Sequence, residues 1–287
     1  MKSPAVSRRT FVHTVLATAT LAAWPRLRAS VAAPASRVAF NTANLVARFS
    51  GYRFQLNRWN DQVKKTVAAM DEKVWEEMCA EIAAAGFRAV EIWVAHLDPS
   101  TMTDGRAATY RRILDDHGLQ PIGLGGALTA ETARICRLFG MPSCNGRGNL
   151  PWDQVRELVR STGINYYWEN HSEKSADALV AALGGGGPGI GLTVDTGWLA
   201  TQGLDAPATI RALPRELIRH VHIKDVRHAG KHETCPLGEG LVDFPGTFAA
   251  LREIGYTGWY SWEDEPEDRN PLDIARAMRE KIEGYLA

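Results

Sequence analysis

Two hydrophobic patterns alternate along the chain after residue 35. Short apolar runs are followed by longer segments with apolar residues three or four positions apart; in 71–85, Val74, Met78 and Ile82 share one face. This alternation predicts repeated β–α units. The eight predicted strands are Arg37–Asn41, Ala89–Val94, Gln120–Gly123, Met141–Asn145, Ile164–Glu169, Gly191–Asp195, Ile218–His222 and Gly258–Glu263.

Helix-like patterns separate nearly all of these strands, and glycines mark where the chain turns back. Glycine at a helix end permits the left-handed conformation needed there. Eight such units in about 250 residues favour one closed (β/α)₈ TIM barrel, an α/β fold covering residues 36–287. A doubly wound sheet is the alternative, but Gly123-Leu124-Gly125-Gly126 lacks the glycine spacing of a dinucleotide-binding turn. The predicted turn glycines are Gly86, Gly118, Gly140, Gly163, Gly189 and Gly255.

The N-terminus has the features of an export signal. Arg8 and Arg9 precede an apolar stretch from Val12 to Ala23, and Ala33-Pro34-Ala35 has a small-x-small cleavage pattern. The stretch is too short for a membrane span and is followed by Pro25. We therefore expect residues 1–35 to be a twin-arginine (Tat) signal peptide, the mature protein to be periplasmic, and no stable membrane insertion after cleavage.

The net charge and the cysteines limit the kinds of partner and of metal site that we expect for this protein. Removing residues 1–35 removes five basic and no acidic residues, which leaves 28 basic against 33 acidic residues. A mildly acidic mature chain argues against a nucleic-acid partner. The four cysteines lack zinc-site spacing, and core or free thiols are favoured over disulfides, whose pairing the sequence does not define.

Each of the last four predicted strands ends in a side chain that can bind a metal. In a barrel, the carboxyl ends of adjacent parallel strands surround one mouth, where active sites are built. One acid at a strand end is usually a helix N-cap or a solvated charge, but four in succession favour a shared site. The four residues, called here the Glu-Asp-His-Glu group, are Glu169, Asp195, His222 and Glu263.

Three carboxylates and one imidazole form an oxygen-rich ligand set without thiolates. Such a set suits Mn²⁺, Mg²⁺ or Co²⁺ better than it suits a structural zinc ion. We expect one divalent ion, manganese first, with magnesium, cobalt or zinc as alternatives.

Several motifs together resemble the xylose-isomerase-like sugar phosphate isomerase/epimerase family, over essentially the whole chain after residue 35. The resemblance implies a TIM barrel with one divalent ion on the Glu-Asp-His-Glu group and isomerisation or epimerisation beside a carbonyl. The family also includes dehydratases, lyases and, more distantly, apurinic endonucleases. The motifs are Gly86–Glu91, Trp168–His171, Val194–Gly197, His220–Asp225, Gly238–Asp243 and Trp262–Glu263.

One position departs from the family pattern. The residue three after the ligand aspartate is often histidine, but here it is Trp198, which cannot accept a hydrogen bond or act as a base. Its indole could instead stack on a sugar ring. Trp93, Trp168 and Trp262 also lie near predicted strand ends, where they line a carbohydrate pocket or simply pack in the core.

Further candidates accompany the group. Lys224 and His171 each follow a predicted ligand by two residues, so strand alternation points each side chain to the same side as that ligand. Lys224 is expected to stabilise an oxyanion, and His171 is expected to bind substrate. Solvated or structural roles are the alternatives. Glu91 is expected to orient a ligand or bind substrate, unless it is a buried, paired carboxylate. His220 is expected to support the site or the core rather than to bind the ion.

The predicted function is a metal-dependent sugar isomerase or epimerase, with Glu169 and Glu263 moving protons on either side of an enediolate. Export favours a small non-phosphorylated sugar, keto-sugar or glycoside as substrate. A lyase, dehydratase or deglycosidase acting on 3-keto-glycosides is the first alternative. An endonuclease-IV-like nuclease and a non-catalytic sugar-binding barrel are less favoured, since the first needs more ligands and a basic groove.

Overall fold

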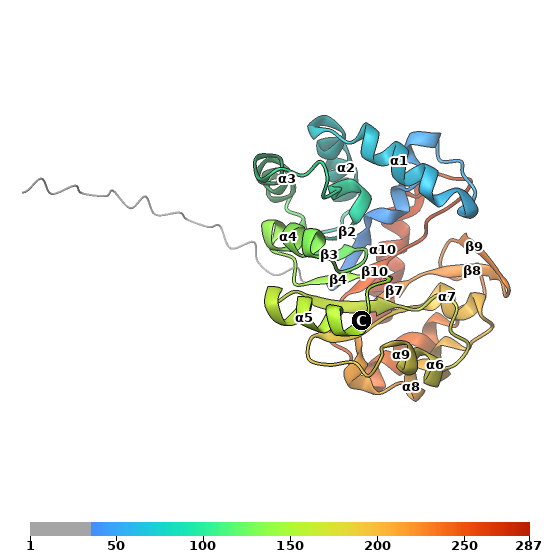
Figure 1. The fold of residues 1–287 in the computed structure, drawn as a ribbon. Helices are drawn as coiled ribbons and strands as arrows, with labels where there is room; N and C mark the ends of the chain where they lie inside the picture. The colour runs from blue at the N-terminus through green and yellow to red at the C-terminus, as the bar shows by residue number, and fades with distance from the viewer. Residues whose placement is uncertain (1–35) are drawn as a thin grey trace, which may run out of the picture. The chain divides into compact units, whose positions relative to one another are not determined.

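Eight parallel strands form a closed barrel in the computed structural model, which describes residues 36–287 (Figure 1). The predicted signal peptide lies outside the described residues. The strands follow one another around the barrel in chain order, and the predicted TIM-barrel fold is confirmed. They are β1 (Val38–Asn41), β2 (Ala89–Trp93), β3 (Gln120–Gly125), β4 (Ser143–Asn145), β5 (Asn165–Glu169), β6 (Ile190–Asp195), β7 (Ile218–Ile223) and β10 (Tyr260–Trp262).

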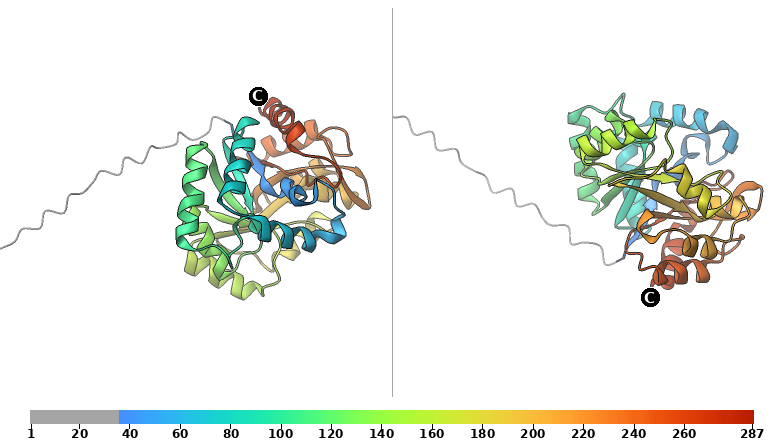
Figure 2. Two further views of the ribbon diagram at one scale, coloured as in Figure 1. Left: turned by 90° about the horizontal axis from the view of Figure 1, so that it is seen from above. Right: turned by 60° about the horizontal axis from the view of Figure 1, so that its bottom comes forward.

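The helices form the outer layer around these strands (Figure 2). Their apolar faces pack on the barrel, as Trp75, Met78 and Ile82 of the second helix do. The helices are α1 (Trp59–Ala69), α2 (Glu72–Ala84), α3 (Asp104–Asp116), α4 (Ala130–Phe139), α5 (Trp152–Thr162), α6 (Ala176–Ala182), α7 (Thr196–Thr201), α8 (Ala206–Ala212), α9 (Phe244–Glu253) and α10 (Leu272–Leu286). Five short 3-10 helices are Thr42–Leu45, Arg48–Ser50, Leu56–Arg58, Val94–Leu97 and Arg215–Leu217.

The predicted turn glycines all have positive φ angles. Gly140 and Gly163 end α4 and α5, each with φ of 71°, a conformation that costs other residues energy. Gly189 differs from the expectation in one respect, because it directly precedes β6 and does not cap a helix.

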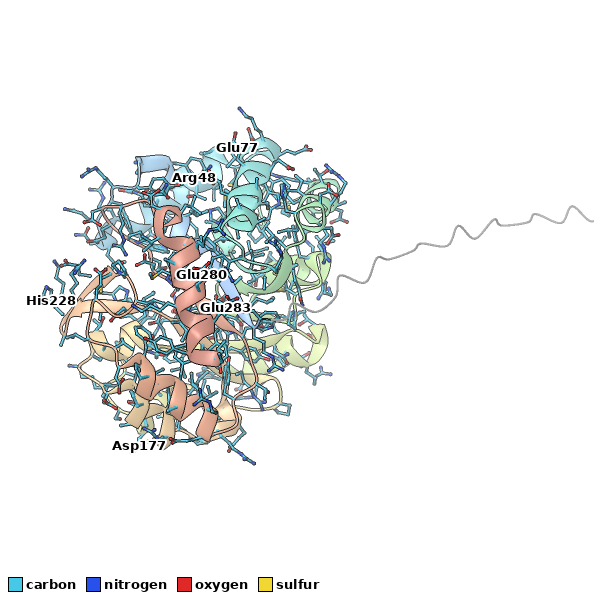
Figure 3. All side chains as sticks on the ribbon, turned by 180° about the vertical axis from the view of Figure 1, so that it is seen from behind. Arg48, Glu77, Asp177, His228, Glu280 and Glu283 are labelled. Atoms are coloured by element: carbon cyan, nitrogen blue, oxygen red, sulfur yellow. The ribbon has the colours of Figure 1, made fainter. Side chains whose placement is uncertain are left out.

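Two helices and a hairpin of two strands were not predicted. Helix α1 carries a partly exposed, polar sequence, and α7 is only six residues long. A hairpin of β8 (Asp225–His228) and β9 (Lys231–Cys235) follows β7, and its exposed end carries His228 at the edge of the molecule (Figure 3). In the same view, Arg48 lies near Glu77 of α2, 3.7 Å from it.

Asp225 fixes the segment after the hairpin. Its carboxylate accepts hydrogen bonds from the backbone N–H groups of Gly238 (2.8 Å), Gly240 (2.9 Å) and Val242 (3.1 Å).

None of the helices described in residues 36–287 has the length and the apolar character that a membrane span requires.

Candidate metal centre

The Glu-Asp-His-Glu group comes together at the carboxyl end of the barrel. Each of its residues offers one ligand atom, and these four atoms lie within 4.8 Å of one another. His222 is at the centre, with Nδ1 3.0 Å from Glu169 Oε1, 3.1 Å from Glu263 Oε2 and 3.8 Å from Asp195 Oδ2. The structure therefore assembles the four residues that the sequence placed together.

Strand register brings these side chains to one level. Asp195 pairs with His222 across β6 and β7, while Glu169 ends β5. Asp195 also caps α7, because its Oδ1 accepts from the Trp198 N–H at 2.7 Å. The Asn170 amide clamps the backbone of Asp195 with two hydrogen bonds, of 2.7 and 3.0 Å. The second carboxylate oxygen of Asp195 is left facing the group.

Two oxygens of the group suit a cation. Glu263 Oε1 accepts from Asn41 Nδ2 at 2.7 Å, whereas Glu263 Oε2 and Asp195 Oδ2 are buried without a hydrogen-bond partner. The Lys224 ammonium is close to both oxygens but does not meet them with hydrogen-bond geometry. Buried carboxylate oxygens without partners are costly, and a divalent ion is the partner that oxygen and imidazole ligands suit. The residues present thus fit a metal.

Glu91 lies beneath His222 and is completely buried. Its carboxylate is 3.1 Å from His222 Nε2 and 2.8 Å from His220 Nε2, and it accepts from Asn145 Nδ2 at 2.9 Å. Glu91 does not line the cavity, so its position fits orientation of a ligand better than substrate binding. It also matches the alternative of a buried carboxylate paired with a basic neighbour, His220. A carboxylate on the outer nitrogen of a ligand histidine is a common support in metal sites.

The electrostatics of the site favour a positive charge. Burial alone would lower the pKa of His222, but the carboxylates of Glu263, Glu91 and Glu169 raise it well above its usual value. Burial alone would likewise raise the pKa of Glu169, yet His171 and His222 lower it to about 2. The negative charge that holds a proton on His222 is the charge that would attract a cation to the same place.

Lys224 is buried and not solvated, so the alternative of a loop lysine is wrong. Its Nζ is 3.1 Å from Asp195 Oδ2, 2.6 Å from Glu263 Oε2 and 2.7 Å from Glu265 Oε2. Gly197 makes room for this side chain, because a Cβ there would lie 2.6 Å from Lys224 Cγ.

A cavity of about 360 Å³ opens over the group. His171 lines this cavity, with its Nε2 3.3 Å from Glu169 Oε2. Lys224 lines it too. Trp93 and Trp198 line it as well. Trp168 and Trp262 do not line this cavity; both are buried in the core, which is the alternative left open for them. Each directly precedes an inward-facing glutamate and so points to the opposite side of its strand.

Trp198 packs against two imidazoles. Its ring centre is 4.4 Å from that of His171 and 3.7 Å from that of His232, and the His232 ring is nearly parallel to it, at 8°. His232 comes from the hairpin and is held by Thr201, at 2.9 Å. The indole thus supports His171, and sugar stacking at this position stays a prediction.

Several residues that line the cavity were not predicted from the sequence. Asn41 is the last residue of β1, and its position at a strand end was a usable signal. Trp59, Arg147 and Glu265 lie in α1 or in loops, so only the tertiary structure brings them to the cavity. Glu265 has a positive φ of 49°, a conformation uncommon for residues other than glycine.

The fold and site define a TIM barrel with a buried acidic-histidine group that could bind a metal ion. A family model described as "Xylose isomerase-like TIM barrel" matches residues 151–284. This segment contains the whole Glu-Asp-His-Glu group but not Gly86–Glu91, so the resemblance expected over the rest of the chain stays a prediction.

Two curated relatives and one solved structure give the context. The chain is similar to inosose dehydratase of Lacticaseibacillus casei, with 31% identity over 116 residues, which are 34% of this chain and 38% of that protein. It is 32% identical over 157 residues to inosose dehydratase of Geobacillus thermodenitrificans, covering 45% and 51%. The chain thus spans about half or less of these relatives.

The structure of D-allulose 3-epimerase from Methylomonas sp. superposes with a TM-score of 0.61 and 17% identity, covering 87% of this chain and 98% of that one. At this identity the likeness shows the fold alone. The relatives are enzymes, and their names indicate small-molecule substrates.

Proposed function

We propose that this protein is a divalent-metal-dependent enzyme that isomerises or epimerises a small non-phosphorylated sugar, keto-sugar or glycoside. The observation that carries the proposal is the buried Glu-Asp-His-Glu group, three of whose residues, Glu169, His222 and Glu263, line a cavity of about 360 Å³. Sugar-epimerase and inosose-dehydratase names among the similar proteins support a reaction beside a carbonyl. Manganese is the first choice of ion.

The group would hold the ion, which when bound would act as a Lewis acid toward a substrate carbonyl and its neighbouring hydroxyl. Glu169 and Glu263 each have carboxylate oxygens at the cavity, and they approach His222 from different strands. One accepts the proton from the carbon beside the carbonyl, and the other returns a proton to the enediolate.

His171 and Lys224 assist these carboxylates. His171 Nε2 is 3.3 Å from Glu169 Oε2, close enough to exchange a proton with that oxygen. Lys224 lines the cavity, and its ammonium, 2.6 Å from Glu263 Oε2, stabilises negative charge that develops on a substrate oxygen.

The charge of the cavity supports a substrate without phosphate. Its basic side chains already contact carboxylates: Arg147 lies 3.2 Å from Glu173, and Lys224 contacts three acids. A phosphate would therefore meet more negative than free positive charge. This supports the expectation that followed from export.

A dehydratase or lyase is the second candidate, because both curated relatives are named inosose dehydratase. It would begin with the same removal of an α-proton and then expel a leaving group from the β-carbon. A deglycosidase acting on 3-keto-glycosides would follow that course, with the aglycone as leaving group.

We also propose that the enzyme acts in the periplasm after export by the twin-arginine pathway. Arg8, Arg9 and the Ala33-Pro34-Ala35 pattern support this proposal. N-terminal sequencing of the exported protein tests it: a mature chain that begins near residue 36 is expected, and an intact N-terminus contradicts export with cleavage.

The test of the reaction is deuterium uptake. Metal-loaded protein is incubated with a panel of keto-sugars and 3-keto-glycosides in D₂O, and NMR follows the α-carbon. Exchange is expected, and it should be lost in Glu169→Gln and Glu263→Gln but retained in the exposed-site control Glu280→Gln. Exchange with epimer formation supports the first candidate, whereas released aglycone or water loss supports the second. Full exchange in Glu263→Gln would refute the role of Glu263.

A further inference from the structure

Two cysteines of the barrel wall lie in contact. Cys136 on α4 and Cys144 on β4 are completely buried, and their Sγ atoms are 3.5 Å apart. The other two cysteines belong to different elements, Cys79 to α2 and Cys235 to β9. We propose that Cys136 and Cys144 form an intramolecular disulfide when the chain meets a disulfide oxidant, such as an oxidised dithiol protein or oxidised glutathione.

The local structure holds both thiols in place. The chain leaves α4 through Gly140, and the Met141 N–H donates to the Cys136 carbonyl at 2.8 Å. Ser143 and Cys144 then enter β4, where Cys144 pairs with Leu124 and Tyr166. A disulfide needs its sulfurs about 2.05 Å apart, so they must approach by roughly 1.5 Å, a movement that side-chain rotation can share between them.

The reaction is a thiol–disulfide exchange in two steps. One cysteine loses its proton and attacks the oxidant's disulfide, which forms a mixed disulfide and releases one thiol. The second cysteine loses its proton and attacks the mixed disulfide, which closes the Cys136–Cys144 bond and releases the second thiol. Two electrons pass to the oxidant. The contact with Cys144, together with burial, raises the pKa of the Cys136 thiol, so exchange proceeds through local opening of the α4–β4 segment.

The bond would reinforce the part of the barrel that supports His222. Strand β4 has only three residues, and its last one, Asn145, donates to Glu91, which in turn contacts His222. A disulfide that closes the loop between Cys136 and Cys144 should raise the melting temperature by about 5–10 °C relative to the reduced protein.

The experiment counts thiols in the full folded chain. Protein is treated with excess oxidised glutathione, with and without a urea concentration below the unfolding transition, then acid-quenched, unfolded and alkylated. Intact mass should show two alkylated cysteines out of four and a loss of two hydrogens, and peptide mapping should find Cys136 joined to Cys144. The melting temperature should fall on adding reductant.

Matched variants separate this pair from the other cysteines. The double variant Cys79→Ser/Cys235→Ser should still form the cross-link and keep the reductant-dependent melting shift. The conservative variant Cys136→Ser should not form it, and its melting temperature should not respond to reductant. Four alkylated cysteines in both urea arms, or glutathione adducts on Cys136 or Cys144 without ring closure, would overturn the proposal. None of these results depends on the proposed enzyme activity.

Discussion

Replacing Glu91 by glutamine should weaken metal binding although Glu91 does not belong to the proposed ligand set. Its carboxylate faces three groups, at 2.8, 2.9 and 3.1 Å, two of which are imidazole nitrogens. A glutamine keeps one acceptor oxygen and gains an N–H₂ group. When that N–H₂ donates to His222 Nε2, the imidazole must carry its proton on Nδ1, the nitrogen that faces the Glu-Asp-His-Glu group.

The expected loss follows from the support that such partners give to ligand histidines. Their removal usually costs ten- to a hundredfold in metal affinity, which is about 1.4 to 2.7 kcal/mol. Isothermal titration of the metal-free protein with Mn²⁺ measures this directly. Far-ultraviolet circular dichroism should show that Glu91→Gln remains folded.

The control is a glutamate that also contacts a histidine but belongs to α2, in the outer layer of helices. Glu76 is 2.6 Å from His117, with half of its side chain exposed. Glu76→Gln should leave Mn²⁺ affinity unchanged. If a folded Glu91→Gln variant binds Mn²⁺ as tightly as the wild type, Glu91 does not orient His222 for metal binding.

Three further predictions concern single positions. Gly197→Ala should lower stability by about 1–3 kcal/mol through overpacking against Lys224, measured by urea unfolding; an unchanged midpoint would contradict the close fit. Burial lowers the pKa of His96 to about 3, against about 6.5 when unfolded. The unfolded chain then binds a proton that the folded chain does not, so stability is complete above about pH 6.5 and falls by up to about 5 kcal/mol toward pH 3. The variant His96→Gln should show a shallower acid dependence, and equal slopes would refute this account. Trp198→Phe should retain kcat better than Trp198→Ala if the indole serves to support His171; equal losses with a raised KM would instead indicate direct contact with substrate.

The fold and the four proposed ligands were accessible from the sequence because they depend on local rules. Buried parallel strands appear in the sequence as apolar runs, and in a barrel their carboxyl ends surround one mouth. The four residues at these ends could therefore be grouped without any contact information: Glu169, Asp195, His222 and Glu263. The same alternation placed His171 on the cavity side.

Other features depend on packing that no local pattern records. Lys224 faces the site, but its burial against three acids requires the space left by Gly197. Arg147 and Trp59 reach the cavity from a loop and from a helix that was not predicted. For Trp168 and Trp262, strand alternation could have decided between the pocket and the core, since it points the neighbour of an inward-facing glutamate outward.

The metal content of the mature protein tests the metal centre. The protein is purified without added metal and measured by elemental analysis beside a Glu169→Gln/Asp195→Asn double variant. We expect about one manganese or similar divalent ion per chain in the wild type and its loss in the folded double variant. Wild-type protein without bound metal, and without thermal stabilisation by Mn²⁺, Co²⁺, Mg²⁺ or Zn²⁺, would contradict the metal centre and leave a metal-free binding barrel as the better interpretation.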